Sequence, residues 1–225
     1  MGKCTENKLL SAGFNYILIG LCITISTVCL SSDVNPIEEN LSKGLKGWEE
    51  KIFNRKTIYS VETLNNQNVL KAVSNNSASG LFKKININLK KYPYLSWKWK
   101  IKKKLKISNE KTKDGDDYAA RLYVISKSRF FFWETKSLCY VWSNSKTENS
   151  CWGDPFALNN VIIVPVSDSN DKIDTWYTIK RNVFEDFKKY FHETFDSIND
   201  IAIMTDTDNS HEKTTAYYSD IFFSK

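Results

Sequence analysis

The chain has 225 residues, a formal net charge of +6 and 41% hydrophobic residues. This hydrophobic content can form a packed core and excludes a globally disordered chain. With only 8 glycines and 4 prolines, a collagen-like or low-complexity sequence is also excluded. Aromatic residues make up 14% of the chain, which favours a β-rich core, a surface on which ligands stack, or both.

Residues 1–31 form a predicted targeting segment. Lys3 and Lys8 give it a positive start, and an apolar run over residues 14–30 ends before the polar residues 32–36. This order is typical of a cleaved signal peptide, and the run is just shorter than the ~18–20 residues that a membrane-spanning helix needs. We expect export to the periplasm or the outside with cleavage near Ser31, and an uncleaved N-terminal membrane anchor is the alternative. Residues 32–41 are predicted to form a short linker.

Two of the five cysteines, Cys139 and Cys151, lie beyond the predicted leader. They flank the polar segment 143–150 at a separation of 12 positions. In an oxidising compartment they could close this segment as one disulfide. The alternative is two buried thiols.

After the linker, the hydrophobic pattern has a period of two. In residues 94–101, apolar side chains alternate with serine and lysine, as in a half-buried antiparallel strand. Alternation or short apolar runs predict further strands at 57–63, 67–74, 79–89, 118–126, 137–143, 160–167, 175–180, 200–205 and 215–223. We therefore predict one all-β domain over residues 42–225, an antiparallel β-sandwich.

One short helix is predicted near residues 182–192. Asn182 is followed three residues later by Glu185, which resembles a capping box. Apolar residues then recur at steps of three and four, which gives the helix one apolar face. We expect this helix to cover one edge or end of the sandwich.

Several common chemistries have no support in the sequence. The only two histidines, His192 and His211, lack the spacing of a zinc site. The chain contains no Gly-x-Ser-x-Gly elbow, no Walker loop and no Gly-x-Gly-x-x-Gly. We expect no organic cofactor. A lysine-rich segment at 98–113 could contact nucleic acid or an anionic envelope surface. The predicted export argues against nucleic acid, and we interpret the segment as a solvated face.

Carboxylates gather in two segments. Asp116 and Asp117 precede the predicted strand at 118–126, and Asp206 and Asp208 follow the strand at 200–205. Asp117 and Asp206 could act as the carboxylate pair of a glycosidase. Asp208, together with Asp220 in the last strand, is a candidate Ca²⁺ ligand because Ca²⁺ prefers oxygen ligands. The alternative for all these acids is solvated turns.

Arginine is scarce, with 4 against 28 lysines, and Arg121 lies within a partly apolar strand. It shares one face with Ala119 and Tyr123, so it serves either in an ion pair or in ligand binding. Trp133 and Trp152 lie between predicted strands, where an exposed indole could stack on the apolar face of a sugar ring.

Several segments occur together in a recognisable order: 95–99 (LSWKW), 116–124 (DDYAARLYV), 175–177 (TWY), 181–187 (RNVFEDF), 201–209 (IAIMTDTDN) and 216–222 (AYYSDIF). Over residues 42–224 the chain resembles the bacterial DUF3047 family of exported proteins of unknown function. The resemblance implies a jelly-roll β-sandwich similar to galactose-binding-like domains and to non-catalytic carbohydrate-binding modules. It assigns no catalytic residue. Ser219 departs from the family pattern, which has glycine at this position.

The sequence thus predicts an exported, non-catalytic binding module for glycan or another envelope component. The predicted ligand-binding residues are Asp117, Arg121, Trp133, Trp152 and Asp206. Two alternatives remain open at this point. One is a hydrolase of envelope polysaccharide that uses Asp117 and Asp206, and the other is a structural envelope protein with no small ligand.

Overall fold

The computed structural model describes residues 41–127, 135–146 and 151–225. The predicted leader, nearly all of the predicted linker and Trp133 lie outside these residues. Within the described ranges, none of the helices has the length and apolar character needed to cross a membrane.

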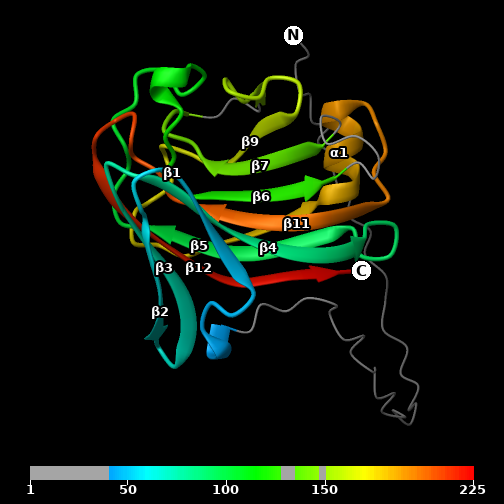
Figure 1. Ribbon diagram of the computed structural model, residues 1–225, viewed down its shortest axis with the longest axis horizontal. Helices are drawn as coiled ribbons and strands as arrows, with labels where there is room; N and C mark the ends of the chain where they lie inside the picture. The colour runs from blue at the N-terminus through cyan, green and yellow to red at the C-terminus, as the bar shows by residue number, and fades with distance from the viewer. Residues whose placement is uncertain (1–40, 128–134, 147–150) are drawn as a thin grey trace, which may run out of the picture.

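The fold is an all-β sandwich of a seven-stranded and a five-stranded sheet, which confirms the predicted jelly roll (Figure 1). In spatial order the larger sheet contains β1 (Trp48–Asn54), β4 (Ala78–Asn88), β11 (Ser197–Met204), β6 (Arg121–Ser126), β7 (Lys136–Trp142), β9 (Val161–Ser167) and β8 (Trp152–Gly153). The smaller sheet contains β10 (Tyr177–Asn182), β5 (Tyr94–Ile101), β12 (Lys213–Ser224), β3 (Gln67–Asn75) and β2 (Ile58–Leu64). Neighbouring strands are antiparallel except β7 and β9, which are parallel.

The alternating pattern in the strands places the core between the two sheets. Leu122 and Val124 of β6 are completely buried in this core, whereas Arg121 and Tyr123 point to the opposite face of the larger sheet. A second, smaller apolar cluster forms on that outer face, around Tyr118, Cys139, Val141 and Ile163. The larger sheet is therefore covered on both faces over part of its area.

Four of the described tryptophans belong to the main core, and three of them are almost completely buried. Trp97, Trp99 and Trp142 expose at most 1% of their surface. The ring centroids of Trp99 and Trp142 lie 6.0 Å apart, and the Trp99 indole donates a hydrogen bond of 3.1 Å to Ser167. Much of the aromatic excess in the sequence therefore serves packing between the sheets.

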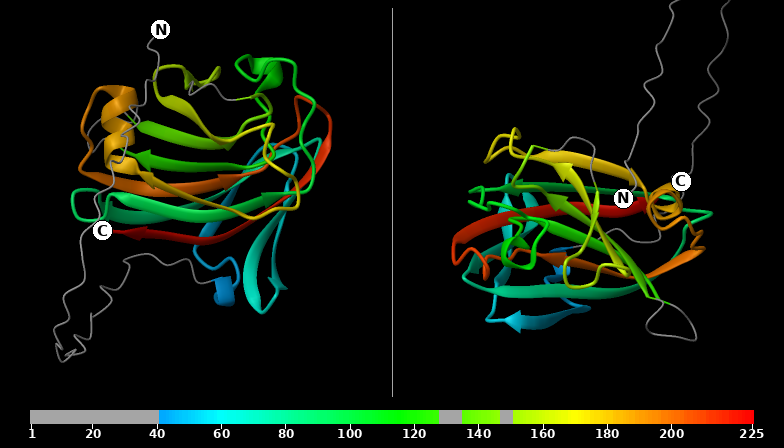
Figure 2. Two further views of the ribbon diagram at one scale, coloured as in Figure 1. Left: turned by 180° about the vertical axis from the view of Figure 1, so that it is seen from behind. Right: turned by 90° about the horizontal axis from the view of Figure 1, so that it is seen from above.

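The predicted helix is α1 (Val183–Phe191), and Asn182 caps it by accepting a hydrogen bond of 3.1 Å from the Glu185 amide. Asp186 fixes the helix to the sandwich, because its carboxylate accepts hydrogen bonds from Tyr140 at 2.7 Å and from Arg181 at 2.8 and 2.6 Å. Figures 1 and 2 show α1 at one end of the sandwich.

The loops that contain several of the predicted site residues lie at the opposite end of the sandwich. The turn η2 (Lys113–Gly115), the connection from β5 to β6 and the loop from β11 to β12 meet there (Figures 1 and 2). Both carboxylate-rich segments of the sequence are therefore at this end.

Candidate functional site: an acidic pocket with exposed phenylalanines

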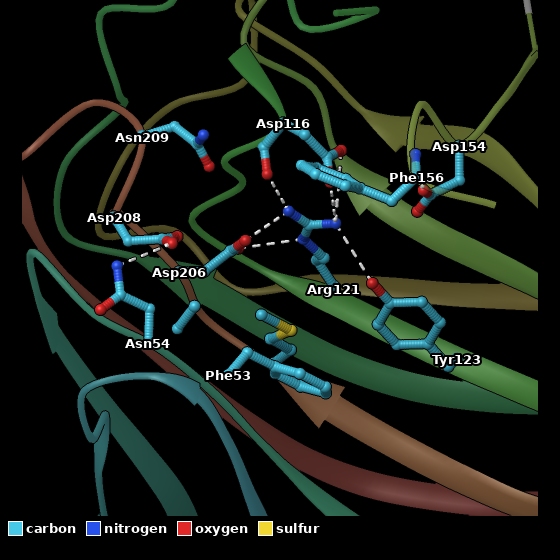
Figure 3. A pocket seen from close by; sticks show the side chains of 12 residues that line it. Phe53, Asn54, Asp116, Arg121, Tyr123, Asp154, Phe156, Asp206, Asp208 and Asn209 are labelled. Carbon is cyan, nitrogen blue, oxygen red and sulfur yellow. Dashed lines mark hydrogen bonds and ion pairs between the residues drawn. The ribbon is translucent and has the colours of Figure 1, made fainter. Parts of the chain in front are cut away.

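A pocket of about 410 Å³ opens on the outer face of the larger sheet (Figure 3). Its walls come from the end of β1, the start of β4, the β5–β6 connection, β6, the end of β11 and the loops that follow β8 and β11. The sheet order β1-β4-β11-β6 brings these distant segments together. Of the predicted site residues, Arg121, Asp206 and Asp208 line this pocket.

Arg121 lies at the centre of the pocket and exposes only 2% of its surface. Its Nε donates to Asp206 Oδ1 at 2.9 Å, and one terminal nitrogen donates to the other oxygen of Asp206 and to the Asp116 carbonyl. The second terminal nitrogen donates to the Asp116 carboxylate at 3.3 Å and to the Tyr123 hydroxyl at 3.1 Å. A guanidinium group has five N–H donors, and all five have protein acceptors here. Arg121 therefore organises the pocket and has no donor left for a ligand.

Asp206 is held by the loop that follows β11. Its Oδ1 also accepts a hydrogen bond of 3.1 Å from the Tyr118 amide, and its own amide donates to the Tyr118 carbonyl at 3.2 Å. The two threonines beside it, Thr205 and Thr207, are completely buried and point away from the pocket into a network of hydroxyl groups. This alternation explains why aspartates and threonines follow one another in this segment.

The hydroxyl network joins β3, the turn between β3 and β4, the residue before β2 and the loop after β11. Thr207 Oγ1 lies 2.8 Å from the Ser74 hydroxyl, which lies 2.9 Å from the Ser77 hydroxyl. Thr57 lies 3.1 Å from Ser77 and donates a hydrogen bond of 2.9 Å to the Thr205 carbonyl. Because buried polar groups are costly unless they are hydrogen-bonded, this network fixes the loop that carries Asp206 and Asp208.

Asp116 and Asp117 are adjacent in sequence but have different environments. Asp116 lines the pocket, whereas Asp117 lies behind it, where its oxygens accept hydrogen bonds from the amides of Asn209 at 3.3 Å and Ser210 at 2.6 Å. Gly115 precedes them at a close approach, since a Cβ there would lie 2.2 Å from the Asn109 carbonyl oxygen. Asp117 thus fixes the β11–β12 loop and does not face the pocket.

The carboxylates of the pocket are poorly compensated by positive charge. Burial raises the pKa of Asp116 to about 6; Arg121 opposes this shift, and the nearby Asp154 adds to it. Burial also raises the pKa of Asp206 above its usual range, against the effect of Arg121. Among the described residues, four carboxylates line the pocket, and the Arg121 guanidinium is the one positive charge that lies among them.

Two exposed phenylalanines flank this polar floor. Phe53 at the end of β1 and Phe156 in the loop after β8 each expose 63% of their surface. Figure 3 shows them on opposite sides of Arg121. The loop of Phe156 is shaped by Asp154, whose Oδ1 accepts hydrogen bonds from the amides of Phe156 at 2.8 Å and Ala157 at 3.1 Å. Exposed rings on both sides of a pocket provide flat apolar surfaces for a ligand.

Sequence reasoning did not identify Phe53, Phe156 or Asp154. Phe53 lies in β1, whose residues after Trp48 are all exposed and show no clear alternation. The residues Gly153-Asp154-Pro155 predict a turn from the sequence alone. Phe156 directly follows this turn, and an aromatic residue in that position was the available signal for an exposed ring.

The other predicted site residues lie elsewhere. Trp152 is half-buried against the smaller apolar cluster, beneath Lys111, whose ammonium group is 5.0 Å from the ring centroid. Asp220 lies in β12, where its carboxylate contacts Lys98 at 2.8 Å and Gln67 at 2.5 Å. Trp152 and Asp220 do not line the pocket.

No disulfide joins Cys139 and Cys151, and both residues are thiols in the structure. Cys139 of β7 is opposite Ile163 of β9, and Ile163 is in turn opposite Trp152 of β8. A whole strand therefore lies between Cys139 and the strand that follows Cys151. The structure therefore has two separate thiols and no disulfide. Cys139 is fully buried among apolar side chains.

Three carboxylates, those of Asp117, Asp206 and Asp208, offer oxygen atoms within 4.8 Å of one another. This is the spacing of a cation site, but Ca²⁺ needs six to eight oxygen ligands. Asp206 accepts hydrogen bonds from Arg121, and both carboxylate oxygens of Asp117 accept hydrogen bonds from backbone amides. A calcium ion would therefore compete with donors of the protein itself, and Ca²⁺ binding by Asp208 stays a prediction.

A model of the family described as "Protein of unknown function (DUF3047)" matches residues 46–222. The chain therefore belongs to this family, as the sequence motifs indicated. A search of curated proteins finds no match.

Among solved structures, the fold is similar to a family 11 carbohydrate-binding module of a Clostridium thermocellum cellulosomal cellulase, with 13% identity, a TM-score of 0.44, and coverage of 84% of this chain and 91% of that one. A family 30 module from the same organism gives 11% identity, a TM-score of 0.46, and 80% and 91% coverage. An endoglucanase of Rhodothermus marinus gives 8% identity, a TM-score of 0.42, and 77% and 94% coverage. At these identities and TM-scores, the similarity assigns neither a ligand nor an activity to this chain.

Proposed function

We propose that this protein is an exported, non-catalytic module that binds a glycan of the cell envelope in the pocket around Arg121. The observation that carries the proposal is the pair of exposed rings, Phe53 and Phe156, on either side of a floor rich in hydrogen-bond acceptors. A sugar ring has apolar C–H faces that pack on aromatic rings and hydroxyl groups that donate to carboxylates. The pocket offers both kinds of contact.

The volume of the pocket agrees with this proposal. About 410 Å³ lies in the range of sites that enclose small molecules, and it is enough for one or two sugar rings with the remainder of the chain outside. The fixed position of Arg121, which uses all its donors within the protein, gives a rigid floor. Rigid sites lose less free energy on ordering when a ligand binds.

A glycan array with the full-length protein in a mild detergent tests this proposal. We expect binding to at least one envelope glycan, weakened about 2- to 12-fold by Phe156→Ala or Phe53→Ala, because one aromatic contact contributes about 0.5–1.5 kcal/mol. Ile173→Ala is the matched control, since Ile173 is an exposed apolar residue outside the pocket. Failure of every glycan to bind, or full binding by the double phenylalanine variant, would refute the proposal.

A second candidate function is hydrolysis of the bound glycan, for which Asp116 gives a specific reason. Its pKa of about 6 suits a general acid, and Asp154 lines the same pocket. The pair proposed from sequence, Asp117 and Asp206, is less suited to this role, because both carboxylates are bound by donors of the protein and Asp117 lies behind the pocket. Release of new reducing ends from envelope polysaccharide, lost in Asp116→Asn, would favour the hydrolase.

A further inference from the structure

We infer that the ligand of this pocket carries a positive charge, and specifically that the bound glycan contains a free, protonated amino group, as in a glucosamine unit that is not acetylated. The inference rests on the proposed glycan binding and names the chemical class of the ligand.

The first reason is the balance of charge in the pocket. Of the residues that the structure describes, Asp116, Asp154, Asp206 and Asp208 line it, against the single cation Arg121. Arg121 is paired with Asp206 through two hydrogen bonds and with Asp116 through a longer one. Asp154 and Asp208 form no ion pair with any described residue, as their oxygens accept only from amides. A cationic ligand would supply the missing charge.

The second reason is that the pocket cannot favour an anion. Among the described residues, Arg121 is the only cationic side chain that lines it, and its five N–H donors are all directed at protein acceptors. A phosphate or a uronic acid inside the pocket would meet several carboxylates, and the ammonium group of Lys113 lies only at the rim, against Phe156. Repulsion between like charges in a partly buried site therefore selects against acidic glycans.

The third reason comes from the aromatic rings. Phe53, Tyr123 and Phe156 line the pocket together with the carboxylates. Aromatic faces attract ammonium groups, most strongly where the groups are partly desolvated. The structure already has one such contact at the rim, where the ammonium group of Lys113 lies 5.3 Å from the centroid of Phe156. An amino sugar could use the ring for its C–H face and a carboxylate for its amine.

A comparison of matched tetrasaccharides tests the inference. The probes are β-1,4-linked glucosamine tetramer, the same tetramer fully N-acetylated, and tetralysine, each titrated at pH 7 and low salt by calorimetry into the full-length protein in detergent. We expect the glucosamine tetramer to bind at least 10-fold more tightly than its N-acetylated counterpart. Asp154→Asn and Asp208→Asn should each reduce this ratio at least 3-fold.

Asp196→Asn is the matched control, because Asp196 is an exposed partner of Lys90 outside the pocket, and it should leave the ratio unchanged. Thermal melting of every variant checks folding, and Asp208 is only partly buried in a loop, so this variant should fold. Lys113→Ala should tighten binding of the glucosamine tetramer, since it removes a competing ammonium group from Phe156.

The outcomes separate this inference from the proposed function. Equal binding of both tetramers, weakened for both by Phe156→Ala, would overturn the amine preference and leave glycan binding intact. Tetralysine binding as tightly as the glucosamine tetramer, with no effect of Phe156→Ala, would overturn the inference in favour of general attraction of cations. Binding of neither tetramer would also overturn it, and the glycan array then decides the proposed function by itself.

Discussion

Arg121 and Asp206 are 85 residues apart in sequence, and in the structure both carboxylate oxygens of Asp206 accept hydrogen bonds from the Arg121 guanidinium. This bidentate ion pair joins β6 to the loop that follows β11. Both partners are buried, because only 2% of the Arg121 side chain and 3% of the Asp206 side chain are exposed. Buried pairs of this kind require desolvation of both charges. The pair therefore contributes more to the geometry of the pocket than to net stability.

Removal of Arg121 should be strongly destabilising. Arg121→Met leaves Asp206 and Asp116 buried without their cation, and breaking a buried pair from one side costs about 3–5 kcal/mol. Urea denaturation at pH 7 measures this loss. Arg55→Met is the control, because Arg55 is exposed, and it should change the free energy of unfolding by less than about 0.5 kcal/mol. Equal stability of the two variants would show that Arg121 is not needed to compensate the acids.

Asp116 should make stability depend on pH in an unusual direction. Its pKa is about 6 in the folded protein and about 3.9 in an unfolded chain. Between these values the folded state binds more protons, so the contribution of Asp116 to stability is present below about pH 4 and is lost as the pH rises through 6. Asp116→Asn lacks this dependence. We expect its free energy of unfolding, relative to wild type, to rise by about 2–3 kcal/mol between pH 4 and pH 7.

Urea denaturation of both proteins across this pH range gives the difference directly, and other titrating groups cancel in it. A constant offset between the two proteins at all pH values would contradict the prediction, because it would mean that Asp116 titrates at its ordinary value. The prediction also bears on function, since a carboxylate that costs stability at neutral pH is better explained by a ligand than by folding.

The fold was largely predictable from the sequence, because strand alternation is a local signal. Residues 94–101 match β5 at both ends, and the capping residue Asn182 marks the start of α1. β1 was missed, since its exposed residues hide the period of two, and β8 is only two residues long. The segment at 118–120 is buried but not in a strand, because β6 begins at Arg121.

The candidate site was predictable only in part. Arg121 stood out because arginine is rare in the chain, and Asp206 because of its acidic segment. The sequence could not reveal that β1, β4, β11 and β6 are neighbours, so it could not place Phe53 beside Asp206. Pairing between strands far apart in the chain depends on the whole packing arrangement. Asp117 illustrates the same limit, as its role in the loop depends on the distant amides of Asn209 and Ser210.

Cys139 should be chemically inert in the folded protein. It is fully buried, and burial raises the pKa of its thiol well above the usual range, so little reactive thiolate is present at neutral pH. Native protein treated with iodoacetamide at pH 8 and then mapped by mass spectrometry should show Cys139 unlabelled, and labelling should be complete in urea. Rapid labelling in the native state, or a peptide that links Cys139 to Cys151, would contradict the structure.

The hydroxyl group of Tyr218 should be important for the floor of the pocket. Tyr218 lies in β12 of the smaller sheet and is completely buried. Its hydroxyl donates to the Met204 carbonyl at 2.8 Å and lies 2.9 Å from the Thr205 hydroxyl. It also accepts a hydrogen bond of 3.3 Å from the backbone amide of Arg121. This one oxygen therefore links the smaller sheet to the two segments that carry Arg121 and Asp206.

Tyr218→Phe keeps the ring but removes these bonds, so buried groups on β6 and β11 lose a partner. We expect a loss of about 1–3 kcal/mol in urea denaturation, since an unsatisfied buried group carries its desolvation cost. Hydrogen exchange of the Arg121 amide should become faster by at least 10-fold, because its acceptor is gone. Tyr92→Phe, at a half-buried tyrosine away from the pocket, should change neither quantity. Unchanged exchange at Arg121 in Tyr218→Phe would mean that the amide is protected by packing alone, and the link between the sheets would not depend on this hydroxyl.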